Sequence, residues 1–113
     1  MSTNQAPPKT YNKFVAAHPE FGKAWQLMRE AEAQGPLDDK TARLIKLGIA
    51  IGAMREGAVH SNVRKALAAG ITPEELEHVV ALAASTLGMP ATVAVFSWVH
   101  DVLDRKDAPD APA

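Results

Sequence analysis

The chain contains no cysteine among its 113 residues. This absence excludes disulfides, thiolate metal sites and cysteine nucleophiles, because each of them needs the sulfur atom itself. It also excludes a self-contained thiol peroxidase, since no other side chain cycles between a thiolate and a disulfide.

The sequence also lacks an excess of charge of either sign. Twelve Lys and Arg residues stand against 13 Asp and Glu residues, for a formal net charge of -1. Because nucleic acids and anionic membranes are attracted by a concentrated positive field, we expect neither as a partner.

Long hydrophobic runs are absent as well. The longest nearly apolar stretch, 44–54, is interrupted by Lys46 and would cover roughly 16 Å as a helix, about half of a bilayer core. The first ten residues lack the apolar centre of a secretory signal. We therefore expect no membrane span and a cytoplasmic location.

Proline and charge mark the two ends of the chain. The segment 104–113 is rich in both and has no large apolar residue, so it cannot bury enough surface to order itself. We expect disordered tails over 1–10 and 104–113, and one folded domain over 11–103.

Between these tails, apolar residues recur at helical spacing, and no strand-like alternation is bounded by turns. Thr72 and Glu75 have the form of a capping box, and Gly70 is suited to end the preceding helix. The sequence predicts an all-α fold, a compact bundle of about five to six helices. We expect them over 11–17, 19–33, 39–53 with Asp38 as N-cap, 56–69, 73–87 and 91–103.

Apolar faces indicate how these helices pack. Phe21, Trp25 and Met28 form one stripe along 19–33, which we expect to be core. The helices over 73–87 and 91–103 are apolar almost all round. Helices without a polar face in so small a domain favour burial against another subunit, so we predict a homo-oligomer.

One segment concentrates polar side chains that can carry chemistry. Glu56 and His60 are four residues apart, so their side chains share one face of a helix and can pair. A carboxylate beside an imidazole is sufficient for general acid–base catalysis. A solvated surface pair is the alternative that the same spacing allows.

Glu56 and His60 also match half of a metal site on a helix. A third ligand would have to come from His78, from His100 or from another subunit. On this ligand count we expect no bound metal. The sequence contains no glycine-rich phosphate loop and no dinucleotide fingerprint, so we expect no cofactor either.

Arg43 stands among apolar neighbours in the helix that follows Asp38. A guanidinium in such surroundings needs a carboxylate or several carbonyl groups. Arg43 is therefore a candidate for holding an anionic ligand. The alternative is that it faces solvent or pairs with Asp39, four residues earlier.

Three segments resemble the carboxymuconolactone decarboxylase family, which includes the alkylhydroperoxidase D-like proteins. They are LDDKTARLIKLGIA over 37–50, EGAVHSNVRKALAAGITPEE over 56–75 and LGMP over 87–90. The resemblance covers about 19–103. It implies a compact helical subunit that assembles into trimers or hexamers, with sites near subunit contacts.

The resemblance also shows where this chain departs from the family. The peroxidase-like branch uses a glutamate, two cysteines and a histidine, and those places fall here on Arg43, Arg55, Ala58 and Asn62. The decarboxylase branch needs no cysteine but is similar at the glutamate and histidine places. This chain instead resembles a cysteine-free subgroup with the run 56–61, in which another histidine commonly stands at the place of Asn62.

Two hypotheses on function follow. The first is a cofactor-independent lyase or acid–base enzyme acting on a small anionic compound, a carboxylated lactone or related carbonyl compound. His60 would be the acid–base group and Glu56 its orienting partner. Arg43, Arg55 and Asn62 would hold the ligand. The second is a non-catalytic oligomeric binding or scaffold protein that retains the fold, since a fold does not determine a function.

Overall fold

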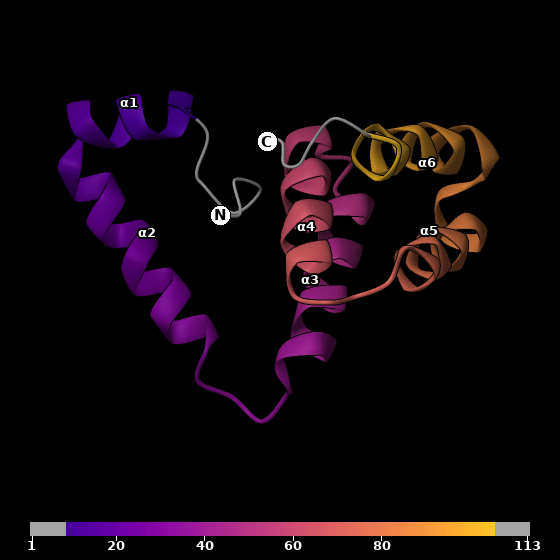
Figure 1. Cartoon of the computed structure of the whole chain (residues 1–113), viewed down its shortest axis with the longest axis horizontal. Coiled ribbons are helices and arrows are strands. Elements are labelled where there is room, and N and C mark those ends of the chain that lie inside the picture. The colour runs from indigo at the N-terminus through magenta and orange to yellow at the C-terminus, as the bar shows by residue number, and fades with distance from the viewer. Residues whose placement is uncertain (1–8, 106–113) are drawn as a thin grey trace. The chain divides into compact units, whose positions relative to one another are not determined.

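The computed structural model describes residues 9–105 of the chain, and within them it contains helices and no strand. This confirms the predicted all-α class. The predicted tails lie largely outside the described residues. The helices are α1 (Lys9–Ala17), α2 (Pro19–Glu32), α3 (Asp39–Gly52), α4 (Glu56–Ala68), α5 (Pro73–Leu87) and α6 (Met89–Leu103) (Figure 1).

Local signals explain where these helices begin and end. The Asp38 side chain accepts a hydrogen bond from the Thr41 backbone N–H at 2.7 Å and caps α3. Thr72 and Glu75 form the predicted capping box at the start of α5. Gly70 follows α4 with a φ of 90°, a left-handed conformation that favours glycine.

The described residues form two compact units, one with α1 and α2 and one with α3 to α6. In the second unit α3 packs on α4 and α5, and α6 packs on α4 and α5 (Figure 1). The core lies where these four helices meet. Its largest fully buried side chains are Leu47, Ile51, Val59, Val63, Leu76, Val95 and Val99.

The unit of α1 and α2 has no buried residue. Phe21 is 61% exposed and Trp25 is 48% exposed, so the prediction that this stripe is core is wrong for a single chain. Within the unit, Phe14 of α1 contacts Phe21 with ring centroids 5.5 Å apart. A partner helix of nine residues covers only part of a 14-residue helix, so the stripe is left open.

The four-helix unit also leaves apolar side chains exposed on α3, α5 and α6, including Ile49, Leu82 and Met89. None of the helices within 9–105 is long and apolar enough to cross a membrane.

Candidate functional site

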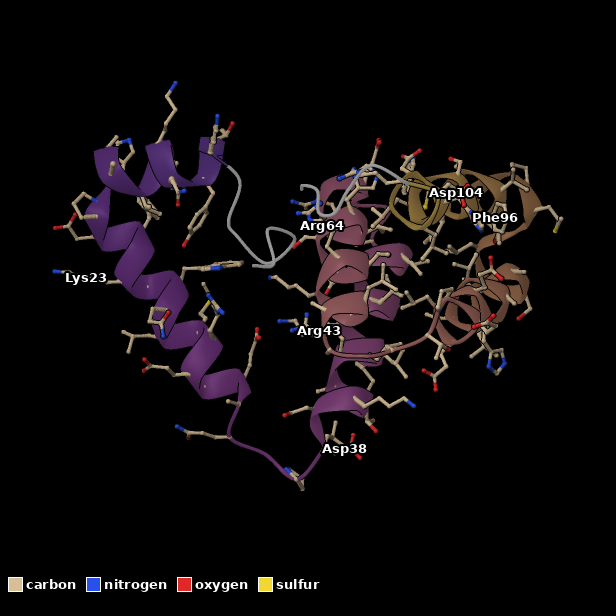
Figure 2. All side chains as sticks on the ribbon, viewed as in Figure 1. Lys23, Asp38, Arg43, Arg64, Phe96 and Asp104 are labelled. Carbon is tan, nitrogen blue, oxygen red and sulfur yellow. The ribbon has the colours of Figure 1, made fainter. Side chains whose placement is uncertain are left out.

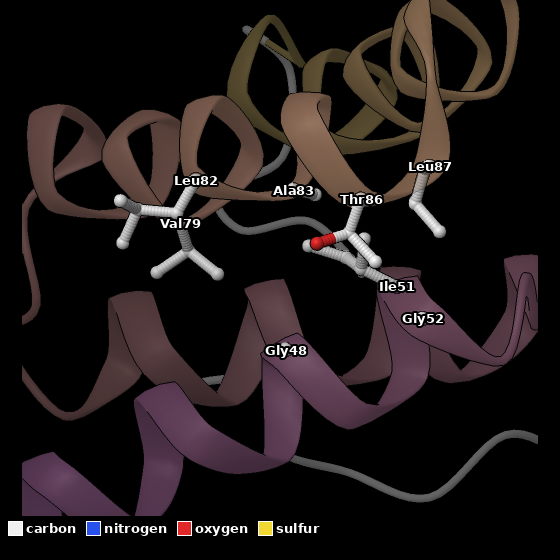
Figure 3. A pocket seen from close by; sticks show the side chains of 8 residues that line it. All are labelled: Gly48, Ile51, Gly52, Val79, Leu82, Ala83, Thr86 and Leu87. Carbon is white, nitrogen blue, oxygen red and sulfur yellow. The ribbon is translucent and has the colours of Figure 1, made fainter.

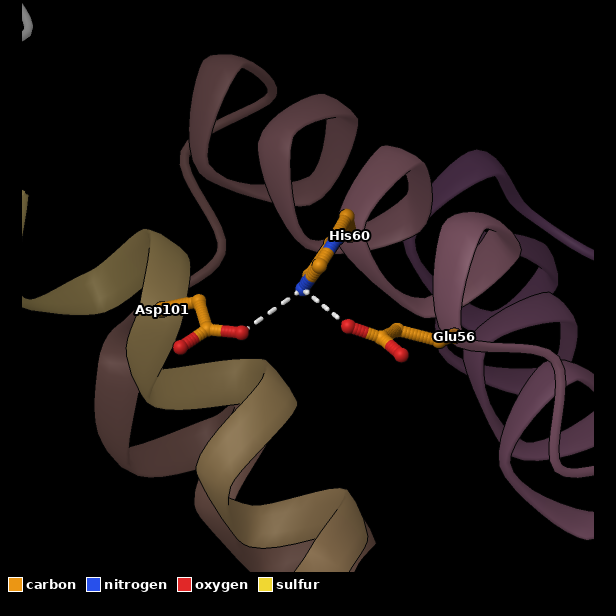
Figure 4. A group of neighbouring side chains, drawn as sticks. All are labelled: Glu56, His60 and Asp101. Atoms are coloured by element: carbon orange, nitrogen blue, oxygen red, sulfur yellow. Dashed lines mark hydrogen bonds and ion pairs between the residues drawn. The ribbon is translucent and has the colours of Figure 1, made fainter.

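Glu56, His60 and Asp101 meet between α4 and α6, and we name them the His60 cluster (Figure 4). Nε2 of His60 lies 2.9 Å from a carboxylate oxygen of Asp101 and 3.9 Å from one of Glu56. The first distance is a hydrogen bond, and the second is an ion-pair distance only. The predicted pairing of Glu56 with His60 is thus present, with Asp101 as the nearer partner.

The buried faces of α4 and α6 hold the His60 cluster in place. Val59 precedes His60 and is fully buried, and Val102 follows Asp101 and is buried as well. Both helices are therefore anchored in the core beside the cluster. The hydrogen bond between His60 and Asp101 orients the imidazole ring, which prepares a histidine for proton transfer or for metal binding.

Arg43 and Asn62 form a second polar contact, between α3 and α4. An N–H of the Arg43 guanidinium donates to the Asn62 side-chain oxygen at 2.9 Å, and the Asn62 amide donates to the Ala58 carbonyl at 2.8 Å. Both bonds are partly buried. We name these two side chains the Arg43–Asn62 pair.

The His60 cluster and the Arg43–Asn62 pair lie on different sides of α4. At about 100° per residue, His60 and Asn62 are about 200° apart around the helix axis. Val59 and Val63, the buried residues of the turn, lie between them. The predicted site residues therefore divide into two groups, and the structure does not bring Arg43 to His60.

Arg55 belongs to neither group. It is the N-cap residue of α4, it is exposed, and its side chain makes no capping hydrogen bond to the helix. It follows Met54, which has a positive φ of 55°. The α3–α4 connection therefore turns sharply at these residues.

The Arg43–Asn62 pair includes two of the four places that the resemblance assigns to the working residues of the peroxidase-like branch. Arg43, Ala58 and Asn62 are three of the four aligned places, and the two hydrogen bonds link all three. In this chain these places hold a guanidinium and an amide, which serve hydrogen bonding and anion binding rather than proton transfer.

Two residues near His60 were not among the predicted site residues. Asp101 is 41 residues away in the chain, so no local spacing could reveal it. Arg64 follows His60 by four residues and shares its helix face, a spacing that was visible in the sequence. Figure 2 labels Arg64, whose side chain projects from α4. Burial lowers the pKa of its guanidinium, and repulsion from Arg105 lowers that pKa further.

A second histidine, His100 on α6, also lies between two carboxylates. Its Nε2 is 2.7 Å from Glu77 and its Nδ1 is 3.1 Å from Asp104, and the Phe96 ring packs on it at 4.2 Å. Burial alone would lower the pKa of His100, but the hydrogen bonds to Asp104 and Glu77 outweigh burial and raise this pKa. His100 ties α5 to α6.

An apolar cavity of about 310 Å³ lies between α3 and α5 (Figure 3). Its lining includes no ionisable side chain and none of the candidate site residues. The lining residues are Gly48, Ile51, Gly52, Val79, Leu82, Ala83, Thr86 and Leu87. The cavity is therefore separate from both polar groups, and it is suited to an apolar side chain or helix face.

Comparison with known proteins identifies the family of the chain. The carboxymuconolactone decarboxylase family matches residues 19–101. Searches of curated proteins and of solved structures find no significant match. The matched region includes both polar groups and the four-helix core. The chain belongs to the carboxymuconolactone decarboxylase family.

Proposed function

We propose that the chain is a thiol-free lyase that transfers protons through His60 and acts on a small carboxylated lactone or related carbonyl compound. The observation that supports this proposal is the 2.9 Å contact between His60 and Asp101. It holds an imidazole in one orientation between two anchored helices. An oriented imidazole is a common acid–base group in enzymes.

The reaction requires one proton at one carbon. When a carboxylate leaves as carbon dioxide, its carbon–carbon bond breaks and the electron pair passes into the conjugated carbonyl group. A proton delivered by His60 to a carbon of the resulting enolate restores the carbonyl group and completes the product. Asp101 holds the ring in position during the transfer, and Glu56 adds a second carboxylate at 3.9 Å.

Charge decides which group holds an anionic substrate near His60. Glu56 and Asp101 carry two negative charges beside one imidazole, so this cluster alone repels a carboxylate. Arg64 lies one helical turn from His60 and supplies a positive charge on that face of α4. We therefore assign the substrate carboxylate to Arg64. The Arg43–Asn62 pair lies on another side of α4.

Turnover of carboxymuconolactone, the compound in the family's name, tests the proposal. We expect carbon dioxide release and loss of the compound's ultraviolet absorbance with the purified chain. His60→Ala removes this activity, whereas His78→Ala, at an exposed histidine of α5, retains it. Equal turnover by the two variants would overturn the role of His60.

A non-catalytic oligomeric binding or scaffold protein is the second candidate. It is favoured by the division of the predicted site residues between two sides of α4. The exposed stripe on α2 and the exposed apolar side chains of α5 and α6 favour self-association. This candidate predicts a trimer or hexamer in sedimentation at micromolar concentration and no turnover. A 12 kDa monomer would contradict the assembly.

A further inference from the structure

We propose that Glu56, His60 and Asp101 form a binding site for a divalent transition-metal ion. The ligand set is one imidazole nitrogen and two carboxylate oxygens, and these atoms all lie within 4.8 Å of one another (Figure 4). From the sequence, Glu56 and His60 are two candidate metal ligands without an identified third, and we therefore expect no bound metal. Asp101 is the third ligand that this expectation lacked.

The distances in the His60 cluster are close to those around a bound ion. A tetrahedral zinc ion with bonds of about 2.0 to 2.2 Å holds its ligand atoms about 3.4 Å apart. Nε2 of His60 lies 2.9 Å from the Asp101 oxygen and 3.9 Å from the Glu56 oxygen, on either side of that value. All three atoms lie within 4.8 Å of one another, so an ion would bind once side-chain rotations bring the two carboxylates together.

Charge and access also suit a cation. Two carboxylates and one imidazole leave the cluster with a net negative charge whether or not the ring is protonated. The side chains of Glu56 and Asp101 are 56% and 53% exposed, and that of His60 is 26% exposed. An ion can therefore enter from solvent and keep open positions for water or for a ligand carboxylate.

The His60 cluster differs from two ordinary surface ion pairs in which ring atom its carboxylates approach. Both carboxylates of the His60 cluster approach one atom, Nε2. At His100 the two carboxylates approach opposite ring nitrogens, so no single ion can contact Glu77, His100 and Asp104. His100 is therefore a control with the same residue types and the wrong geometry.

The ligand types indicate which ion binds. Imidazole favours zinc and other transition-metal ions, whereas magnesium and calcium prefer sites made of oxygen. A site that depends on His60 will therefore prefer zinc to magnesium. A proton competes with zinc for Nε2, so zinc affinity will fall as the pH falls.

This inference goes beyond the proposed function, because it requires no substrate and no turnover. Zinc binding and decarboxylation are measured on separate samples, so either can fail without the other. Zinc bound at Nε2 occupies the same imidazole that the proposed function uses for proton transfer. The chain's acid–base activity is therefore assayed after treatment with a chelator.

The test is calorimetric titration of the chelator-treated full chain with zinc chloride near neutral pH. We expect one zinc ion per chain and much weaker binding of magnesium. His60→Gln should weaken zinc binding by more than about 100-fold, because even outer-shell partners contribute 10- to 100-fold. His100→Gln should leave zinc affinity within about twofold of the wild type, since its carboxylates do not converge.

Two further measurements identify the ring that binds zinc and show that each variant is folded. Nitrogen NMR should show a zinc-dependent shift of the His60 ring and none of the His100 ring, and thermal unfolding should show that each variant folds. The proposal is overturned if zinc gives no heat, if folded His60→Gln binds zinc as tightly as the wild type, or if magnesium binds equally well. The last result would indicate diffuse attraction by the carboxylates.

Discussion

His60 and His100 lie in the same four-helix unit, each beside two carboxylates, and they differ in which ring atoms those carboxylates contact. Both contacts of His60 use Nε2, and both of its carboxylates are more than half exposed. The contacts of His100 use both ring nitrogens, and the Phe96 ring packs against it. A histidine contacted at both nitrogens is a structural tie, whereas one contacted at a single nitrogen keeps a second nitrogen for chemistry.

Residue types alone do not distinguish the surroundings of His60 from those of His100. Each histidine has one carboxylate four residues away in the chain, Glu56 for His60 and Asp104 for His100. Each has a second carboxylate from another helix, Asp101 or Glu77. The difference lies in the ring atoms involved, which depend on how α4, α5 and α6 pack.

The largest expected difference between the two histidines is in turnover. His60→Gln should lower kcat/KM for carboxymuconolactone by about 10²- to 10⁴-fold, the usual contribution of a general acid–base group. His100→Gln should lower it by less than about tenfold, because that ring takes no part in proton transfer. Steady-state kinetics on both variants measures the ratio. Similar losses in both would mean that the clusters are not functionally different.

The two carboxylates of the His60 cluster should also differ in how much each contributes to kcat/KM. Asp101→Asn should lower kcat/KM by about 10- to 150-fold, since a hydrogen bond to a charged group contributes about 1.5 to 3 kcal/mol. Glu56→Gln should have a smaller effect, because its oxygen is 3.9 Å from the ring and makes no hydrogen bond. A larger effect of Glu56→Gln would make Glu56 the orienting residue, as the sequence alone suggests.

The contacts of His100 with Glu77 and Asp104 should dominate the pH dependence of the unfolding free energy between pH 5 and 9. Because the pKa of His100 is raised above its ordinary value of 6.5, its contribution is fully present below about pH 6.5. It is lost as the pH rises through the folded-state pKa. The loss should be below about 1 kcal/mol, since exposed ion pairs contribute little. Urea unfolding between pH 5 and 9 measures it.

His100→Gln supplies the control for this pH dependence. The variant should show a flatter profile of unfolding free energy above about pH 6.5, because the titrating group is gone. If the wild type gains stability as the pH rises through this window, the sign of the linkage is wrong, and the carboxylates do not stabilise the charged ring of His100.

The fold was accessible from the sequence because its signals are local. Asp38 and the Thr72–Glu75 capping box lie within a few residues of the helix starts that they determine. The sequence predicts the start of α6 at Ala91, two residues late, because a proline usually interrupts a helix. In the structure Pro90 occupies the first turn, where its missing N–H has no helical partner to lose.

The candidate site was accessible only where its residues share a helix. Glu56 and His60 are four residues apart, and their pairing follows from the helical repeat. Asp101 and the contact of Arg43 with Asn62 depend on tertiary packing, across 41 and 19 residues of chain. Likewise, the stripe on α2 shows that an apolar face exists, but the sequence does not say what covers it.

The smallest expected difference concerns stability at neutral pH. Glu56→Gln should change the unfolding free energy by less than about 0.5 kcal/mol, because an exposed pair between residues i and i+4 contributes little. Glu77→Gln should have a somewhat larger effect, since its 2.7 Å contact with His100 joins α5 to α6. Urea unfolding of the two variants side by side checks the order. If Glu56→Gln is the more destabilising, the His60 cluster is the structural tie, and the assignment of chemistry to it loses its physical basis.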